Sequence, residues 1–343
     1  MRFILLKAFC FLLVFSSCKS NREVSRSFYY WKPSFDIAGE DARLLSALGN
    51  QRIYLKCFHV VWDKPTKSLK NTDVVSFPSK LTSTEMEFVP VVHLSNDIFL
   101  NMPFKGLEAL SAQIIQSVDA ISDSASFSWA ELQIDCEWSS ETREHYFSLL
   151  NLLKASLKPI DQKLSCSIML KHIKSPDVAG VPPVDRGMLI FYNTGNIDEP
   201  GTRNSIYDAD VAARYVSYIK NYRLPLDLAL PVFSWGVHQR NGDVMSVIQN
   251  ITLKETRESN LFYEKAKGLF VPLAECYFHG SYFKDTDRLR VEEISPRKSM
   301  RAAKQVKPFL NTQSINVALF HLDSNNTVRY GQEAFNELYS VFE

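Results

Sequence analysis

The stretch Glu131-Leu-Gln-Ile-Asp-Cys-Glu-Trp138 decides how the rest of the chain is interpreted. Side chains alternate across a β-strand, so Asp135 and Glu137 are expected to project from the same face of one buried strand. The segment that follows, residues 139–157, has its apolar side chains at helical spacing. A strand that ends in two acids and leads directly into a helix is typical of a (β/α)₈ barrel, in which functional groups lie at the carboxyl ends of the strands.

Seven other segments are apolar and of strand length, and most of them alternate with segments of helical spacing. The eight predicted strands are 28–35, 52–62, 87–94, 131–138, 163–173, 187–194, 225–235 and 315–322. Helices are expected over 40–48, 107–121, 139–157, 209–222 and 333–342, while 66–83 looks polar and irregular. The predicted fold class is therefore α/β, a single-domain (β/α)₈ TIM barrel over residues 28–343.

The connection between the seventh and eighth predicted strands, residues 236–312, is far longer than an ordinary loop with one helix. Asn241-Gly242 is a hairpin signal, and 277–292 resembles a further pair of strands. Ser295-Pro296 predicts the start of a basic helix that runs to Lys307. We therefore expect this insertion to hold an element at the rim of the barrel as well as the seventh helix.

The composition suits a globular protein with a large core, since 45% of the 343 residues are hydrophobic. The chain has 39 basic and 38 acidic residues, and this balance gives no reason to expect nucleic acid as a partner. Beyond residue 18, no cysteine has the spacing of a metal finger, and three of them lie in predicted strands, where buried thiols are expected. The four cysteines beyond residue 18 are Cys57, Cys136, Cys166 and Cys276. We predict a monomer without a metal or cofactor.

The first residues have the pattern of an export signal. Arg2 and Lys7 supply positive charge, and residues 4–15 form a mainly apolar run that is too short to span a bilayer comfortably. Ser16-Ser17-Cys18 resembles the lipobox of bacterial lipoproteins, which implies a signal peptide over 1–17 and a lipid on Cys18. Residues 18–27 would then form a tether, and the protein would be anchored in the bacterial cell envelope, at the outer membrane or facing the periplasm. An ordinary secretory signal with a chance cysteine is the alternative.

Asp135 and Glu137 are the strongest candidates for catalysis. Repulsion and partial burial push the pKa values of two neighbouring carboxyl groups apart, so that one of them keeps a proton to donate. Such a proton donor suits general acid catalysis at a glycosidic oxygen. The structural alternative is that the two carboxylates pair with a basic barrel residue such as Lys171 and only stabilise the fold.

Other polar and aromatic side chains recur at the ends of the predicted strands, where a barrel places its site. A tyrosine hydroxyl and an asparagine amide could hold a sugar substituent, and tryptophan rings could stack on sugar faces. The candidates are Trp31, His59, Trp62, His93, Trp138, Lys171, Tyr192, Asn193, Trp235 and His321.

Two motifs carry a family resemblance. Asp135-Cys-Glu137-Trp138, followed by Thr142-Arg-Glu-His-Tyr-Phe-Ser-Leu-Leu150, resembles the fourth-strand region of family-eighteen chitinases and related endoglycosidases. Ile190-Phe-Tyr192-Asn193 is similar to the sixth-strand Met-x-Tyr-Asp motif of that family. The resemblance implies that Glu137 is the general acid, that Asp135 orients the acetamido group that acts as nucleophile, and that Tyr192 helps to hold this group.

The chain departs from the family pattern at four positions, and at one of them the tryptophan of the eighth strand is not evident near His321. Ala130 and Gln133 stand where the signature has two earlier acids, and Asn193 stands where the sixth strand has an acid. The chain as a whole also resembles bacterial TIM-barrel lipoproteins without an assigned activity, through Val184-Asp-Arg-Gly187 and Tyr192-Asn-Thr-Gly195. That likeness implies the fold and the anchor but no reaction.

Four functions therefore stand as hypotheses. The first is a lipid-anchored glycoside hydrolase that acts on a glycan outside the inner membrane, and the second is a barrel that binds a glycan without cleaving it. The third is a structural envelope lipoprotein. The fourth is a metal-dependent hydrolase, if His59, His93, Asp135 and His321 converge, although neither HxH nor HExxH occurs.

Overall fold

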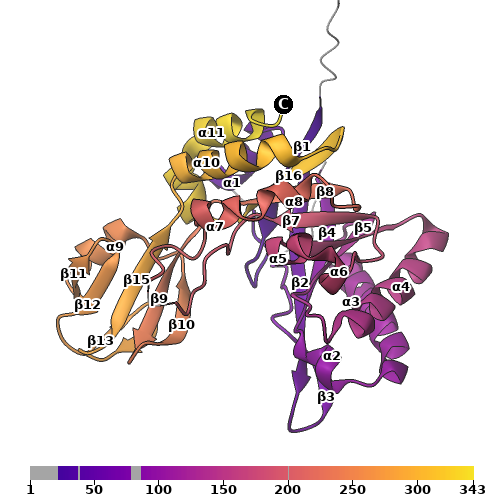
Figure 1. Ribbon diagram of the computed structural model, residues 1–343, viewed down its shortest axis with the longest axis horizontal. Coiled ribbons are helices and arrows are strands. Elements are labelled where there is room, and N and C mark those ends of the chain that lie inside the picture. Colours follow the sequence, from indigo (N-terminus) through magenta and orange to yellow (C-terminus); the bar gives the residue numbers. More distant parts are fainter. Residues whose placement is uncertain (1–21, 38, 79–85, 200) are drawn as a thin grey trace, which may run out of the picture.

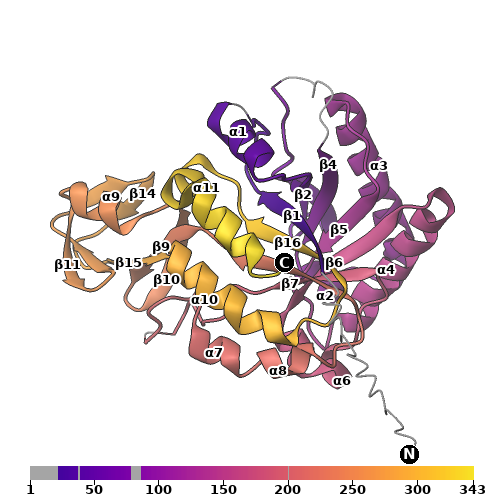
Figure 2. The same ribbon diagram turned by 90° about the horizontal axis from the view of Figure 1, so that it is seen from above.

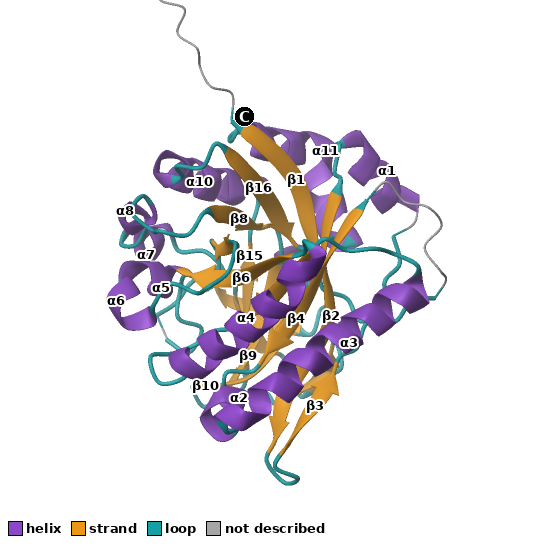
Figure 3. Ribbon diagram, turned by 90° about the vertical axis from the view of Figure 1, so that its right-hand side faces the viewer, coloured by secondary structure: helices purple, strands orange, loops and turns teal. Residues whose placement is uncertain are grey.

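The computed structural model describes residues 22–37, 39–78, 86–199 and 201–343. Within these ranges, eight parallel strands close into a barrel with helices around it (Figure 1, Figure 3). The strand order is β1-β16-β8-β7-β6-β5-β4-β2, and β1 also pairs with β2, which closes the ring. The barrel strands are β1 (Glu23–Tyr30), β2 (Arg52–Asp63), β4 (Glu87–Leu94), β5 (Glu131–Asp135), β6 (Lys163–Met169), β7 (Arg186–Ile190), β8 (Leu226–Pro231) and β16 (Ser314–Phe320). The predicted (β/α)₈ barrel is confirmed.

The two faces of β5 lie in different surroundings, as the alternation of side chains requires. Leu132 and Ile134 are fully buried in the main hydrophobic core. Gln133 lies on the other face, where its amide accepts a 2.5 Å hydrogen bond from the hydroxyl of Tyr29 and donates to Ser165 at 3.3 Å. The barrel interior below the mouth is thus a packed and hydrogen-bonded layer rather than a channel.

The helices cover the outside of the barrel with apolar stripes. On α4, Leu149, Leu150 and Leu153 are fully buried, and each contributes about 1.5–3 kcal/mol by leaving water. The helices around the barrel are α1 (Gly39–Ala47), α2 (Asp97–Asn101), α3 (Leu107–Ala125), α4 (Arg143–Leu157), α5 (Leu170–Lys174), α6 (Pro176–Ala179), α7 (Ala209–Ala213), α8 (Val216–Ile219), α10 (Pro296–Val306) and α11 (Ser324–Ser340). In the part of the chain that the structure describes, none of the helices is long and apolar enough to cross a membrane.

The insertion between β8 and α10 forms a lobe beside the barrel (Figure 1). Its sheet has the order β10-β9-β15-β12-β11, and a hairpin of β13 and β14 packs with it around a separate apolar core. The turn between β9 and β10 is formed by Asn241 and Gly242, both with positive φ, so the predicted hairpin is confirmed. The lobe consists of β9 (Ser234–Arg240), β10 (Asp243–Gln249), α9 (Leu253–Glu258), β11 (Phe262–Ala266), β12 (Leu269–Pro272), β13 (Cys276–Phe278), β14 (Ser281–Phe283) and β15 (Arg288–Glu293).

The helix that follows this lobe begins as its capping signal predicts. The hydroxyl of Ser295 accepts a hydrogen bond from the backbone N–H of Lys298, and Pro296 occupies the first turn. The helix, α10, ends at Val306, immediately before the predicted end at Lys307. It lies beside α11 and returns the chain to the barrel (Figure 2).

Two predicted strands extend too far. The strand expected over 131–138 ends at Asp135, so Glu137 lies beyond it. The strand expected over 225–235 ends at Pro231, and Trp235 lies in β9 of the lobe.

Two further predicted strands, the first and the fifth, also have other boundaries than expected. The first strand begins at Glu23 and ends at Tyr30, because its polar first half pairs in register with β16. Residues 23–27 are therefore part of the barrel rather than of a tether. The fifth barrel strand, β6, ends at Met169, and Lys171 lies in the helix α5 instead of at a strand end. In both places pairing with neighbouring strands, which a single sequence does not show, sets the boundary.

Three predicted segments differ in detail. The range 66–83, expected to be irregular, contains β3 (Ser68–Thr72), which pairs antiparallel with an extension of β2. The helix expected over 209–222 is broken into α7 and α8. The closing helix starts nine residues before residue 333, at Ser324, and changes direction at Gly331, whose φ of 72° is not helical.

The cysteines behave largely as the strand pattern predicts. Cys57, Cys136 and Cys166 are buried and Cys276 is partly buried, and all four are free thiols. Burial raises the pKa of Cys57 to about 12, so this thiol stays protonated and inert. The predicted signal peptide and the lipidated Cys18 lie outside the described residues.

Candidate active site

Asp135 is the last residue of β5 and lies between two polar side chains from the adjacent strands. His93 is its register partner on β4, and the imidazole Nδ1 donates to Asp135 Oδ2 at 2.8 Å. The hydroxyl of Ser167, on β6, donates to the other carboxylate oxygen at 2.5 Å. Burial alone would raise the pKa of Asp135, but the hydrogen bonds and charge of His93 and the bond from Ser167 hold it below its usual value. Asp135 is therefore a fixed, anionic group at the barrel mouth.

A second histidine lies against this group. The ring of His59, on β2, packs edge-on against the ring of His93, with 4.3 Å between centroids, and its Nε2 is 2.8 Å from the hydroxyl of Ser95. Burial, together with the charges of His93 and Lys56, lowers the pKa of His59 to about 4. His59 is thus neutral near pH 7 and packs against the imidazole of His93.

Glu137 lies in a different environment from Asp135 although only Cys136 separates them. β5 has ended, and the Glu137 side chain is 58% exposed at the rim, where the ammonium of Lys171 donates a hydrogen bond to it. Lys171 reaches this position because it lies in the first turn of α5, directly after β6. The pairing with a basic residue that we considered as a structural alternative is therefore present for both acids, for Glu137 with Lys171 and for Asp135 with His93.

A cavity of about 340 Å³ opens over the other half of the mouth, at the ends of β1, β7, β8 and β16. Phe320 lies at its centre, 5.5 Å from Trp31 and 5.1 Å from Tyr192, measured between ring centroids. Burial, and to a smaller extent the charge of Asp135, raises the pKa of Tyr192, so its hydroxyl remains a donor beside the acidic half. The lining residues are Trp31, Lys32, Pro33, Tyr192, Asn193, Phe233, Trp235, Gln249, Asn250, Phe320, His321 and Asp323.

Polar groups at the edge of this cavity could orient a ligand. The indole N–H of Trp235 donates to Glu292 at 2.9 Å, which fixes its ring. The ammonium of Lys32 is 3.0 Å from a carboxylate oxygen of Asp323. Burial lowers the pKa of His321 to about 4, and its buried Nδ1 has no hydrogen-bond partner among the described residues. Flat apolar surface with a few directed polar groups is the usual construction of a carbohydrate site.

The structure divides the side chains predicted from strand ends into separate groups. Trp31, Tyr192, Asn193, Trp235 and His321 line the aromatic cavity.

The remaining predicted side chains lie elsewhere. His59 and His93 meet Asp135, whereas Lys171 meets Glu137. The metal-hydrolase hypothesis requires His321 to lie beside the cluster of His59, His93 and Asp135. Instead, His321 lines the cavity in the other half of the mouth. Within the described ranges, no group of three or more His, Cys, Asp and Glu residues has the geometry to hold a metal ion.

Two predicted sugar platforms lie outside the cavity. Trp62 is on the extension of β2, opposite Leu69 of β3. Trp138 is 1% exposed, and its ring stacks on His172 with 3.6 Å between centroids while its N–H donates to the carbonyl of Ala179 at 2.8 Å. Contrary to our expectation, Trp138 has no exposed ring face, because the helices after β5 and β6 close over it.

Sequence analysis missed several residues of the site. Ser167 was overlooked although it shares with Ser165 the alternation that places small polar side chains on the inner face of β6. Lys32 gave no signal, because its role depends on Asp323, at the far end of the chain. The other cavity residues that the strand pattern did not single out are Pro33, Phe233, Gln249, Asn250 and Phe320.

The comparisons with known proteins concern the fold. No protein-family model matches the chain, and no curated protein matches it either. Similar solved structures include the spore cortex-lytic enzyme SleL of Bacillus cereus, with a TM-score of 0.55 and 14% identity over 94% of this chain and 75% of that one. A chitinase of Chromobacterium violaceum has a TM-score of 0.51 and 12% identity over 92% and 98% of the two chains.

A third similar structure contains a bound sugar. It is a mutant catalytic domain of the Group II chitinase of Ostrinia furnacalis in complex with the chito-oligosaccharide (NAG)5, with a TM-score of 0.51 and 12% identity over 91% of this chain and 94% of that one. The barrel and its insertion are thus similar in fold to those of chitinases and a cortex-lytic enzyme.

Proposed function

We propose that this protein binds an extracytoplasmic glycan across the barrel mouth and hydrolyses it, with Glu137 as the general acid. The observation that carries the proposal is the cavity walled by Trp31, Tyr192 and Trp235 next to the fixed carboxylate of Asp135. Stacking surface and a charged group are both required to bind a sugar and to stabilise the positive charge that develops as its glycosidic bond breaks. The chitinase-like fold is consistent with this use of the mouth.

In the reaction that the family resemblance implies, protonated Glu137 transfers its proton to the glycosidic oxygen as the bond to the anomeric carbon breaks. The acetamido oxygen of the substrate forms the new bond to that carbon, and water later opens the intermediate. Asp135 would orient the acetamido N–H and balance the positive charge, since His93 and Ser167 hold its carboxylate in place. The hydroxyl of Tyr192 would donate a hydrogen bond to the same group.

Glu137 has to leave Lys171 before it can act as an acid. Both side chains are more than half exposed, so the pair is solvent-screened and can separate at little cost. We infer that Lys171 holds Glu137 at the rim in the free protein and releases it when a glycan enters.

The substitution Glu137→Gln tests the proposal directly. Chito-oligosaccharides and cortex fragments are suitable first probes, because chitinases and a spore cortex-lytic enzyme share the fold. Turnover should fall by about 10²–10⁴-fold, while affinity for the glycan is retained. Glu144→Gln, an exposed acid on α4, is the matched control and should leave both unchanged. Undiminished hydrolysis by Glu137→Gln would show that another group supplies the proton.

A second candidate is a barrel that captures a glycan without cleaving it. The pairing of Glu137 with Lys171, together with Gln133 in place of an acid below Asp135, favours this alternative. In that case the wild-type protein binds glycans, Glu137→Gln binds them equally well, and neither turns them over.

The location is also part of the proposal. We propose that Cys18 carries a lipid that anchors the barrel in the cell envelope, which is supported by the charged, apolar and small-residue segments that precede it. Cys18→Ser should move the protein from the membrane fraction to the soluble fraction and abolish incorporation of labelled palmitate. Retention of the variant in the membrane fraction would contradict a lipid anchor.

A further inference from the structure

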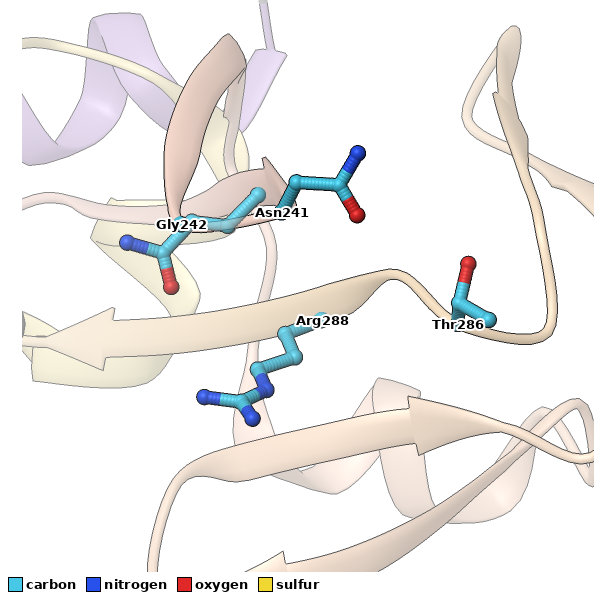
Figure 4. Close-up of a pocket in the computed structure, with 5 residues that line it drawn as sticks. Asn241, Gly242, Thr286 and Arg288 are labelled. Carbon is cyan, nitrogen blue, oxygen red and sulfur yellow. The ribbon is translucent and has the colours of Figure 1, made fainter.

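A second open region lies away from the barrel mouth, between the lobe and the barrel. This groove has a volume of about 800 Å³ and is formed by residues 201–204, by β9, β12 and β15, and by the first turn of α10. At the far end of the lobe it adjoins a smaller cavity of about 380 Å³, because Gln239 and Arg288 line both. Figure 4 shows this end, with Asn241 and Gly242 in the turn on one side and Thr286 and Arg288 on the other.

The groove collects unpaired positive charge. Arg203, Lys267, Arg288 and Lys298 line it and are exposed, and none of them lies within 4.0 Å of a carboxylate among the described residues. Other arginines of the lobe are neutralised by partners. They pair as Arg240 with Asp287, Arg257 with Glu264, and Arg290 with Glu292.

The surroundings of these cations favour an anion. Partial burial lowers the pKa of Lys298, the charge of Glu293 opposes this shift, and the nearby charge of Lys267 adds to it to a smaller extent. Glu293 is the acid that lines the groove, and its carboxylate already accepts from the backbone N–H of Leu253 at 3.1 Å and lies 4.0 Å from Arg329. Like charges that face one space repel each other, and a bound anion removes that repulsion.

The groove shares a sheet face with the barrel mouth. Directly opposed residues of antiparallel strands point to the same face, and Trp235 is opposite both Glu292 and Gln249 while Gln239 is opposite Arg288. Trp235 and Gln249 line the mouth cavity. Gln239 lies four positions after Trp235 on β9, a distance of about 13 Å along the strand. Between the two sites this face is covered, because Glu292 is fully buried and accepts a hydrogen bond from the backbone N–H of Ser205 at 2.6 Å. A glycan that reaches both the mouth and the cations therefore has to pass over the segment that contains Ser205.

We propose that this groove binds the carboxylates of an acidic glycan, so that the ligand of the barrel is an anionic oligosaccharide rather than a neutral one. The inference rests on the proposed function for the identity of the ligand as a glycan. It goes beyond that function by assigning Arg203, Lys267, Arg288 and Lys298 to the recognition of its charge.

A pair of matched double variants tests the inference. Arg288→Gln with Lys298→Gln removes two charges from the groove, whereas Lys265→Gln with Lys284→Gln removes two exposed charges of the lobe that do not line it. Each protein is titrated by calorimetry with a short hyaluronan oligosaccharide, which carries carboxylates and N-acetylglucosamine, and with a neutral chito-oligosaccharide of equal length. Titrations at low and high salt report the charge dependence.

We expect the groove variant to bind the hyaluronan oligosaccharide about tenfold or more weakly, with a smaller salt dependence, and to bind the neutral sugar as the wild type does. The control variant should match the wild type. Equal losses in both variants, or a wild type that fails to bind the acidic sugar, would overturn the inference. Glu137→Gln should leave all these affinities unchanged. The titrations therefore test the groove separately from the proposed hydrolysis, which is tested by turnover.

Discussion

The two halves of the barrel mouth differ in what they present to a ligand. Over β1, β7, β8 and β16 lies a cavity walled by aromatic rings, whereas over β2, β4, β5 and β6 lies a chain of hydrogen-bonded polar groups that ends at Asp135. The aromatic half offers area for binding, and the polar half holds charge in a fixed place. The difference indicates that binding and chemistry can be altered separately in this site.

The largest expected effect is on the polar half. Asp135→Asn removes the carboxylate that His93 and Ser167 orient, so turnover should fall by about 10²–10⁴-fold while glycan affinity changes little. Steady-state kinetics and calorimetric titration on the same preparation measure the two quantities. A loss of affinity as large as the loss of turnover would show that the two halves are not separable.

A large effect on stability is expected from a substitution of Trp138, which is buried below the polar half of the mouth. Trp138→Ala removes a ring that is 1% exposed and stacked on His172, so unfolding free energy should fall by about 3–5 kcal/mol. Urea denaturation followed by circular dichroism measures this change. Trp62→Ala, at a partly buried position on the β2 extension, is the control and should cost much less.

A smaller effect is expected in the aromatic half. Trp31→Ala and Trp235→Ala should each weaken glycan binding about tenfold, because each removes one wall of the cavity. The rate of hydrolysis at saturating glycan should change less than the affinity. Calorimetry on the two variants, with Trp62→Ala as the matched tryptophan control, checks the assignment. A change confined to the rate at saturation would place these rings in the chemistry instead.

The smallest effect concerns pH. The pKa of Asp135 is depressed in the folded protein, so the group stabilises the fold above its unfolded pKa of about 3.9, and this contribution is lost as pH falls through the folded pKa. His93→Gln removes the main cause of the depression. The variant should therefore have a lower free energy of unfolding than the wild type at neutral pH, and this difference, its stability deficit, should decrease in strong acid.

Urea denaturation across this pH range measures that change in the deficit. His279→Gln removes a histidine that contacts an exposed carboxylate, and it should show little deficit at any pH. A deficit for His93→Gln that stays constant down to strong acid would show that the histidine contributes packing alone.

Much of the barrel followed from local patterns. Alternation placed Asp135 on the inner face of β5, and apolar runs marked the strands because both faces of a parallel barrel are buried. The hairpin at Asn241-Gly242 and the start of α10 at Ser295 depend on backbone preferences of a few adjacent residues. Such features can be inferred from sequence, because their causes lie within one or two turns of chain.

Net charge was a poor guide to local charge. The balance of 39 basic and 38 acidic residues conceals a groove in which Arg203, Lys267, Arg288 and Lys298 converge from separate segments. A sum over the chain contains no information about which charges share a space.

By itself the sequence determined the core of most strands, the side chains of β5 that face inward, and Asp135 as the acid at the end of that strand, because alternation and apolar spacing are properties of a short segment. Only the tertiary structure decided that His93 and Ser167 fix Asp135, that Lys171 reaches Glu137, that Trp138 is covered, and that Trp31 and Trp235 share a cavity. Those outcomes depend on strand register and on how the closed barrel packs, and both arise from contacts between residues far apart in the chain.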